Sequence, residues 1–154
     1  MNGAVNLGGS ILSVDLSGIF KPTNGVSFLI IDNDGADPIG GTFAGLPEGA
    51  VFGGEGLPFQ ITYTGGSGND VVLTRVATPA STLSSIATLG NGQVRIEGLG
   101  IVGVIYPIQA ASNLNPVIQW TQVGSGTGNA SGLFQFIDPG ASNRSMRFYR
   151  AVSP

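Results

Sequence analysis

The sequence predicts an all-β fold with almost no helix, and three observations support this prediction. Polar and apolar residues alternate with a period of two in ILSVDLS (11–17) and FQITYT (59–64), as half-buried strands require. Turn sequences such as TNG, GNG and DPG separate the candidate strands at intervals of roughly 8 to 14 residues, the spacing of a sandwich, barrel or solenoid. No long stretch combines a 3.6-residue period with helix caps.

In the first half of the chain, four segments are predicted as strands. Residues 11–17 and 59–64 each place their apolar side chains on one face. The continuous apolar run VSFLIID (26–32) predicts a strand that is covered on both faces. Val71 and Leu73 begin the strand that closes this half.

In the second half, ASTLSSIATL (80–89) is the best candidate for a helix, but its serines and threonines favour a strand equally. The remaining candidate strands are 93–97, 104–110, 117–123, 133–137 and 146–152.

Composition and charge predict two units. Residues 1–76 hold seven acidic and two basic residues, whereas residues 77–154 hold two acidic and four basic ones, so the halves carry −5 and +2. We predict a glycine-rich β-repeat unit with acidic turns over 1–76, a linker over 77–85 and a β-sandwich module over 86–154. The first unit is expected to be a short β-helix-like stack or a sheet, packed with an antiparallel β-sandwich. A single sandwich with a long loop at 77–85 is the alternative.

The composition also limits the function. Only 10% of the residues are charged, against roughly a quarter in ordinary soluble domains, and 26 glycines and 9 prolines are typical of a turn-rich extracellular protein. The chain contains no cysteine and no histidine. This excludes disulfides, thiolate nucleophiles, zinc sites built from these residues and Ser-His-Asp catalysis.

The same sequence argues against two classes of partner. Six basic residues and a net charge of −3 do not form an electrostatic footprint for nucleic acid. No apolar run of about 18 residues predicts a membrane span. The start MNGAVNLGG has no features of a signal peptide, so we expect a fragment of a longer secreted precursor.

Two acidic turns favour a calcium site in the first unit. GGSGNDVVL (65–73) matches one copy of the nonapeptide G-G-x-G-x-D-x-U-x, whose aspartate and turn carbonyls bind Ca²⁺. IDNDGADP (31–38) resembles the start of an EF-type loop, but Phe43 stands where the closing acidic residue belongs. The alternative is that these Asp and Asn residues cap turns. The candidate ligands are Asp32, Asp34, Asp37 and Asp70.

The aromatic residues of the second half are mostly predicted to be core, since Phe134 and Phe136 share one strand face. Trp120 and Tyr149 are the expected exceptions, and as exposed rings they would suit stacking on sugars. The basic residues near the end of the chain are expected to protect an exposed strand edge. They are Arg144, Arg147 and Arg150.

Two segments resemble known families. GGTFAGLPEGAVF (40–52) followed by FQITYTGGSGNDVVLT (59–74) resembles the end of autotransporter-type β-strand repeat regions in large bacterial surface proteins with a parallel β-helix passenger. Residues 94–152, with the closing sequence RFYR, resemble a C-terminal β-sandwich module of secreted, repeat-rich bacterial proteins. The resemblances imply a surface or secreted structural part, in which Asp70 shapes the turn that enters a strand. They imply no catalytic residues.

A β-helix normally stacks many rungs, and this chain has only about three rungs' worth of sequence. Three alternatives follow: the second unit caps the short stack, the first half folds as a sheet against the second, or the chains assemble. The last alternative leaves exposed strand edges and predicts homo-oligomers through them. The leading hypothesis is a non-enzymatic extracellular or cell-surface module for adhesion or carbohydrate contact. The alternative is a small calcium-dependent hydrolase, in which Ca²⁺ polarises an ester, lactone or glycoside and a carboxylate activates water.

Overall fold

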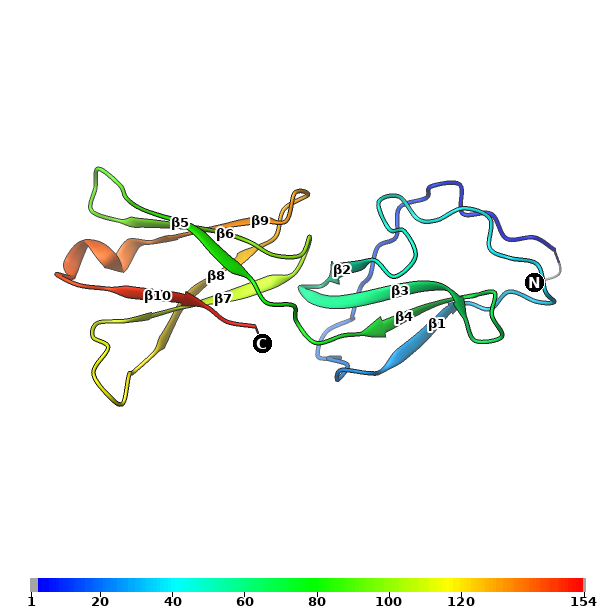
Figure 1. Ribbon diagram of the computed structural model, residues 1–154, viewed down its shortest axis with the longest axis horizontal. Coiled ribbons are helices and arrows are strands. Elements are labelled where there is room, and N and C mark those ends of the chain that lie inside the picture. The colour runs from blue at the N-terminus through cyan, green and yellow to red at the C-terminus, as the bar shows by residue number, and fades with distance from the viewer. Residues whose placement is uncertain (1–2, 154) are drawn as a thin grey trace. The chain divides into compact units, whose positions relative to one another are not determined.

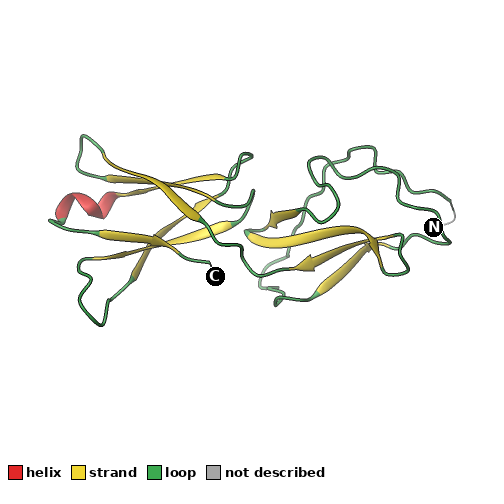
Figure 2. Cartoon of the chain, viewed as in Figure 1, coloured by secondary structure: helices red, strands yellow, loops and turns green. Residues whose placement is uncertain are grey.

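The computed structural model describes residues 3–153 and confirms the all-β prediction. Within residues 3–153 the secondary structure consists of strands and one short 3₁₀ helix, and strands and loops dominate Figure 2. Every strand pairing in the three sheets is antiparallel. The chain divides into two compact units, one through Ala77 and the other from Thr78. No helix within residues 3–153 has the length and apolar character needed to cross a membrane.

The first unit is built on one four-stranded sheet. Its strands are β1 (Ser27–Ile31), β2 (Val51–Gly54), β3 (Leu57–Gly65) and β4 (Asp70–Arg75), in the order β1-β4-β3-β2 (Figure 1). The period of two in β3 buries every second side chain on one face, and β4 adds further apolar residues to that face. The resulting core consists of Leu7, Phe43, Phe52, Phe59, Ile61, Tyr63, Val71 and Leu73.

Of the two alternatives for the first unit, the structure supports the sheet. The ladders that join β1, β4, β3 and β2 are antiparallel, whereas the rungs of a β-helix stack in parallel.

Two strand predictions in this unit are wrong. Residues 11–17 alternate between half-buried and exposed as expected, but the segment is extended without pairing to a sheet. Its apolar side chains pack on the core, so burial alone produces the alternation. The run 26–32 forms β1 but is not covered on both faces, because β1 is an outer strand and Leu29 is 54% exposed. The short strand β2 was not predicted from the sequence.

The second unit consists of two three-stranded sheets, β5-β6-β9 and β10-β7-β8 (Figure 1). Tyr106 of one sheet stacks on Phe134 of the other, with ring centroids 5.2 Å apart. Ile96, Val104 and Ile108 complete a buried core between the sheets, which makes this unit a sandwich. Its strands are β5 (Thr82–Thr88), β6 (Val94–Leu99), β7 (Ile105–Ala111), β8 (Thr121–Thr127), β9 (Leu133–Asp138) and β10 (Phe148–Ala151).

The element bounds in the second unit resolve one open alternative and shift two predicted boundaries. Of the helix and the strand that 80–89 left open, the structure has the strand, β5, and β5 begins inside the predicted linker 77–85. Strand β8 begins at Thr121, four residues later than the predicted start at 117. Residues 112–120 form an exposed loop instead, where Pro116 has no N–H to donate to a ladder.

Candidate functional site

Asp70 is held by the turn that the glycine-rich motif predicts. Its carboxylate accepts hydrogen bonds from the backbone N–H of Ser67 at 2.9 Å, from the Ser67 hydroxyl at 3.2 Å and from the backbone N–H of Asn33 at 2.9 Å. The side chain of Asn69 donates to the carbonyls of Gly35 and Asp37. Asp70 therefore closes its own turn and ties it to the acidic turn after β1.

These hydrogen-bond donors shift the pKa of Asp70. The backbone N–H of Ser67 and then that of Asn33 stabilise the carboxylate, so they lower the pKa of Asp70 below its ordinary value of 3.8. The same hydrogen bonds occupy the oxygens that would face a metal ion.

The predicted calcium ligands lie in neighbouring turns, but their carboxylates are not brought together. Asp32 and Asp37 are exposed, and within residues 3–153 no three acidic side chains lie close enough to hold a metal ion. The buried Asn33 Oδ1 has no hydrogen-bond partner and supplies one further oxygen. Since Ca²⁺ takes about six to eight oxygens, this donor set is incomplete as it stands. Calcium binding, and the hydrolase that depends on it, stay predictions.

An apolar groove of about 520 Å³ lies in the first unit, between the extended segment 12–17 and the face of the sheet. Phe28 and Ile30 of β1 form part of its wall, and Phe20 packs edge-on against Phe28 with centroids 6.0 Å apart. Asp15 lines the groove, but its carboxylate accepts the backbone N–H of Ser17 at 2.7 Å. The groove thus offers apolar surface and few free polar groups.

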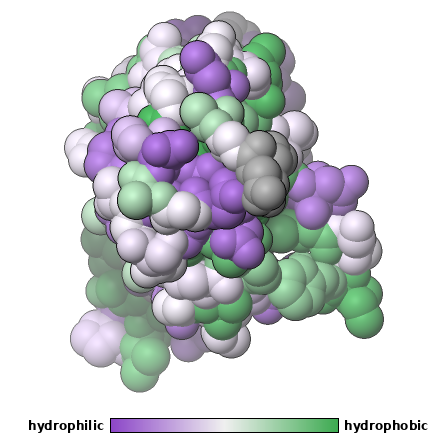
Figure 3. All heavy atoms as spheres, turned by 90° about the vertical axis from the view of Figure 1, so that its right-hand side faces the viewer, coloured by the Kyte–Doolittle hydropathy of each residue, from purple (hydrophilic) through white to green (hydrophobic). Residues whose placement is uncertain are grey.

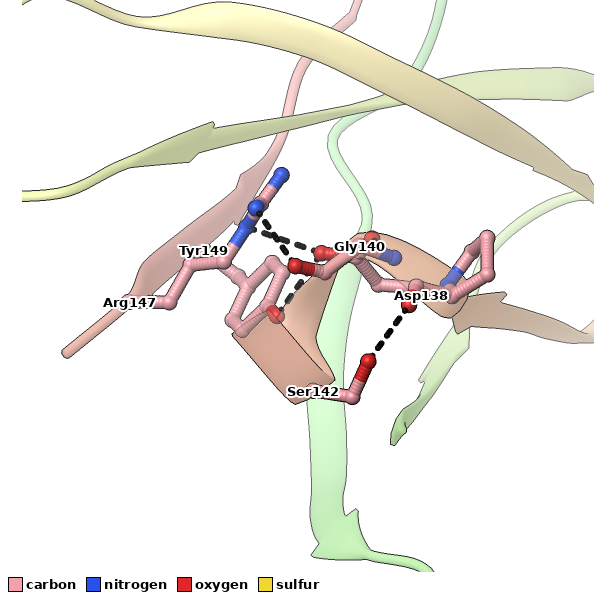
Figure 4. Close-up of polar contacts among 6 residues, drawn as sticks. Asp138, Gly140, Ser142, Arg147 and Tyr149 are labelled. Atoms are coloured by element: carbon pink, nitrogen blue, oxygen red, sulfur yellow. Dashed lines mark hydrogen bonds and ion pairs between the residues drawn. The ribbon is translucent and has the colours of Figure 1, made fainter. Parts of the chain in front are cut away.

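A buried acidic residue, Asp138, organises one end of the second unit (Figure 4). Its Oδ2 is 2.8 Å from Arg147 Nε and accepts the hydroxyl of Tyr149 at 2.9 Å. Its Oδ1 accepts the N–H of Gly140 at 2.9 Å and so caps the 3₁₀ helix η1 (Pro139–Asn143). This cluster joins the end of β9 to the start of β10, and both oxygens of the Asp138 carboxylate have partners within it.

Tyr149 belongs to this cluster and not to an exposed platform, so the expectation that it stands outside the core is wrong. Its ring packs against the core of the sandwich. Burial, with the hydrogen bond to Asp138 and the charge of Asp138, raises the pKa of Tyr149 to about 12.

Trp120 does lie outside both core clusters, as expected. The guanidinium of Arg150 stands over its ring, 4.4 Å from the centroid, and Arg150 Nε donates to Gln109 Oε1 at 2.9 Å. The register places Arg150 beside Gln109 and Gln109 beside Gln122, across β10, β7 and β8. We call this surface the Trp120 face, and it consists of Trp120, Gln109, Gln122 and Arg150.

The charges near the Trp120 face are positive. The two acidic residues of this unit are engaged, since Glu97 pairs with Arg95 at 3.2 Å and Asp138 pairs with Arg147. A groove of about 300 Å³ elsewhere in this unit is lined by Arg144, Gln119 and Thr121, among others. Arg144 and Arg150 form no ion pair within residues 3–153. The prediction that all three arginines protect a strand edge is therefore wrong for Arg147.

Sequence reasoning missed two features of this unit, the role of Asp138 and the pairing of Arg150 with Trp120. Both join residues from different strands, and single-strand periodicity carries no signal for such contacts. Comparisons of the chain with protein-family models, curated proteins and solved structures found no match.

Proposed function

We propose that the protein is an extracellular or cell-surface binding module that contacts carbohydrate through the Trp120 face. The observation that carries the proposal is the packing of Arg150 over Trp120, outside the core and beside Gln109. The parts of the half-buried indole that Arg150 does not cover suit contact with the apolar face of a sugar ring, while the amide and guanidinium groups suit its hydroxyls.

The charges favour acidic sugars within this class. Arg150 is the cation of the Trp120 face, it forms no ion pair in the described chain, and a guanidinium binds carboxylate or sulfate groups well. The site is open, so one contact is expected to be weak. Several modules on one surface would raise the affinity through multivalency.

The extracellular location rests on the composition, with 10% charged residues, 26 glycines and 9 prolines, and on the resemblance of residues 3–76 to a bacterial repeat-region end. Both features suit a structural part of a surface protein.

Trp120 is the only tryptophan in the chain, so intrinsic fluorescence reports on this face directly. We expect uronate- or sulfate-bearing oligosaccharides to change the fluorescence saturably. Arg150→Gln should weaken the binding about tenfold, because the charge over the indole is lost. Gln135→Ala, an exposed change on β9 of the other sheet, is the matched control and should bind like the wild type.

A panel of acidic and neutral oligosaccharides without any saturable change would overturn the proposal. If the wild type and Arg150→Gln bind equally well, the Trp120 face is not the binding site. Titration calorimetry of Trp120→Ala completes the test, since that variant has no tryptophan signal.

A further inference from the structure

The outer strand β1 presents an open backbone edge. It pairs with β4 on one side, and it is the first strand in the order β1-β4-β3-β2, so its other side has no partner strand in the described chain. Unpaired N–H and C=O groups along such an edge are a template for another strand.

The side chains of β1 do not protect this edge. Leu29 is 54% exposed and Ile30 38%, and the strand sequence SFLII contains no charge and no proline. Natural edge strands are usually guarded by such residues. Hydrophobic residues reach the surface beside polar ones in the face of the molecule that Figure 3 presents.

The charges lie at opposite ends of β1. Lys21, the only lysine of the chain, precedes the strand, while Asp32 and Asp34 follow it. All three are free of ion pairs within residues 3–153. Two such strands side by side in antiparallel orientation place Lys21 of each copy at the acidic end of the other, whereas parallel strands would bring the acidic ends together.

We propose that β1 pairs with the β1 strand of a second copy of this chain, antiparallel and about a two-fold axis, so that two four-stranded sheets become one continuous sheet. The two-fold arrangement makes the surface self-complementary and closes the assembly at a dimer. The exposed side chain of Leu29, at the centre of the strand, meets its own copy at the axis. This inference is independent of the carbohydrate site, which lies in the other unit.

Sedimentation equilibrium of the full chain over a wide concentration range tests the proposal. We expect a monomer–dimer equilibrium for the wild type. Leu29→Lys should raise the dissociation constant more than tenfold, because two lysines then face each other at the axis. Ile11→Lys is the matched control, since Ile11 is 86% exposed in the same unit but outside β1, and it should dimerise like the wild type. Circular dichroism and thermal melts establish that both variants are folded.

A charge exchange tests the antiparallel orientation. Lys21→Glu and Asp32→Lys should each weaken the dimer by about three- to tenfold, and the double variant should recover most of the loss, because opposite charges again face each other. Hydrogen exchange should show protection of residues 27–31 that increases with protein concentration.

The proposal fails if the wild type stays monomeric at millimolar concentration, or if Leu29→Lys dimerises as well as the wild type. If the double variant does not recover dimer affinity, the antiparallel orientation is wrong. Growth beyond a dimer would overturn the two-fold closure, since a contact that is not self-complementary leaves an open end.

Discussion

At the scale of single residues, two buried acidic side chains hold neighbouring segments of the chain together through hydrogen bonds and an ion pair. Asp70 accepts three hydrogen bonds from two turns, and Asp138 holds an arginine, a tyrosine and the N-terminus of η1. A buried carboxylate is stable only when such donors surround it. Asp70 and Tyr149, which donates to Asp138, make stability depend on pH in opposite directions.

Asp70 should make the protein sensitive to acid. Because its folded-state pKa lies below the ordinary value of 3.8, its contribution to stability is present above that value and is lost as the pH falls through the folded-state pKa. We expect Asp70→Asn to have a lower free energy of unfolding than the wild type at neutral pH and to lose less of it as the pH falls. Urea unfolding at a series of pH values from neutral to acidic measures both effects. If the free energy of unfolding changes with pH equally in the two proteins, this role for Asp70 is wrong.

Tyr149 should make the protein sensitive to alkali. Its folded-state pKa of about 12 lies above the ordinary value of 10.0, so its contribution is full below pH 10 and is lost as the pH rises toward 12. Tyr149→Phe should cost about 1.5 kcal/mol at neutral pH, the value of a hydrogen bond to a charged group, and should flatten the alkaline loss. Denaturant melts at several alkaline pH values measure both effects, and tyrosinate absorbance shows ionisation directly. The idea is wrong if the variant matches the wild type at neutral pH.

At the scale of elements, glycines in the sandwich make room for aromatic rings. Gly98 of β6 is buried, and a Cβ at this position would collide with the ring of Phe134 and approach the carbonyl oxygen of Thr82 to 2.7 Å. A Cβ at Gly126 would also collide with Phe134, at 2.7 Å from its Cδ2. The close packing of the core around Phe134 therefore depends on the absence of side chains at these two positions.

Gly98→Ala should destabilise the sandwich by about 1–3 kcal/mol, as overpacking of a filled core does. Gly90→Ala is the control, because a Cβ there meets nothing within 4 Å and the φ angle is not in the left-handed region. Chemical denaturation of both variants measures their free energies of unfolding and tests this prediction. Equal stability of Gly98→Ala and Gly90→Ala would show that β6 can shift to accommodate the methyl group.

At the scale of the whole molecule, two separate hydrophobic cores serve the two units. Ile61 is fully buried in the first core, and Ile108 is fully buried in the second. Each core is formed by residues of its own unit. A substitution in one core should therefore lower the stability of that unit more than the stability of the other.

Ile61→Ala should cost about 2–5 kcal/mol through lost burial and the cavity left behind. Hydrogen exchange followed by peptide should show the greater loss of protection in residues 3–77, and Ile108→Ala should show the reverse pattern in residues 78–153. An equal loss in both units from either variant would mean that the two cores unfold together.

The sequence by itself determined that the chain is all-β, because a period of two and closely spaced turns are local signals that each segment carries alone. Local signals also located the Asp70 turn and placed Trp120 outside the core. Only the tertiary structure decided that 11–17 pairs with no strand, that β1 is an outer strand, and that Arg147 and Arg150 have different partners. These facts depend on which segments become neighbours in space, and an alternating segment looks the same at the centre of a sheet, at its edge or lying across it.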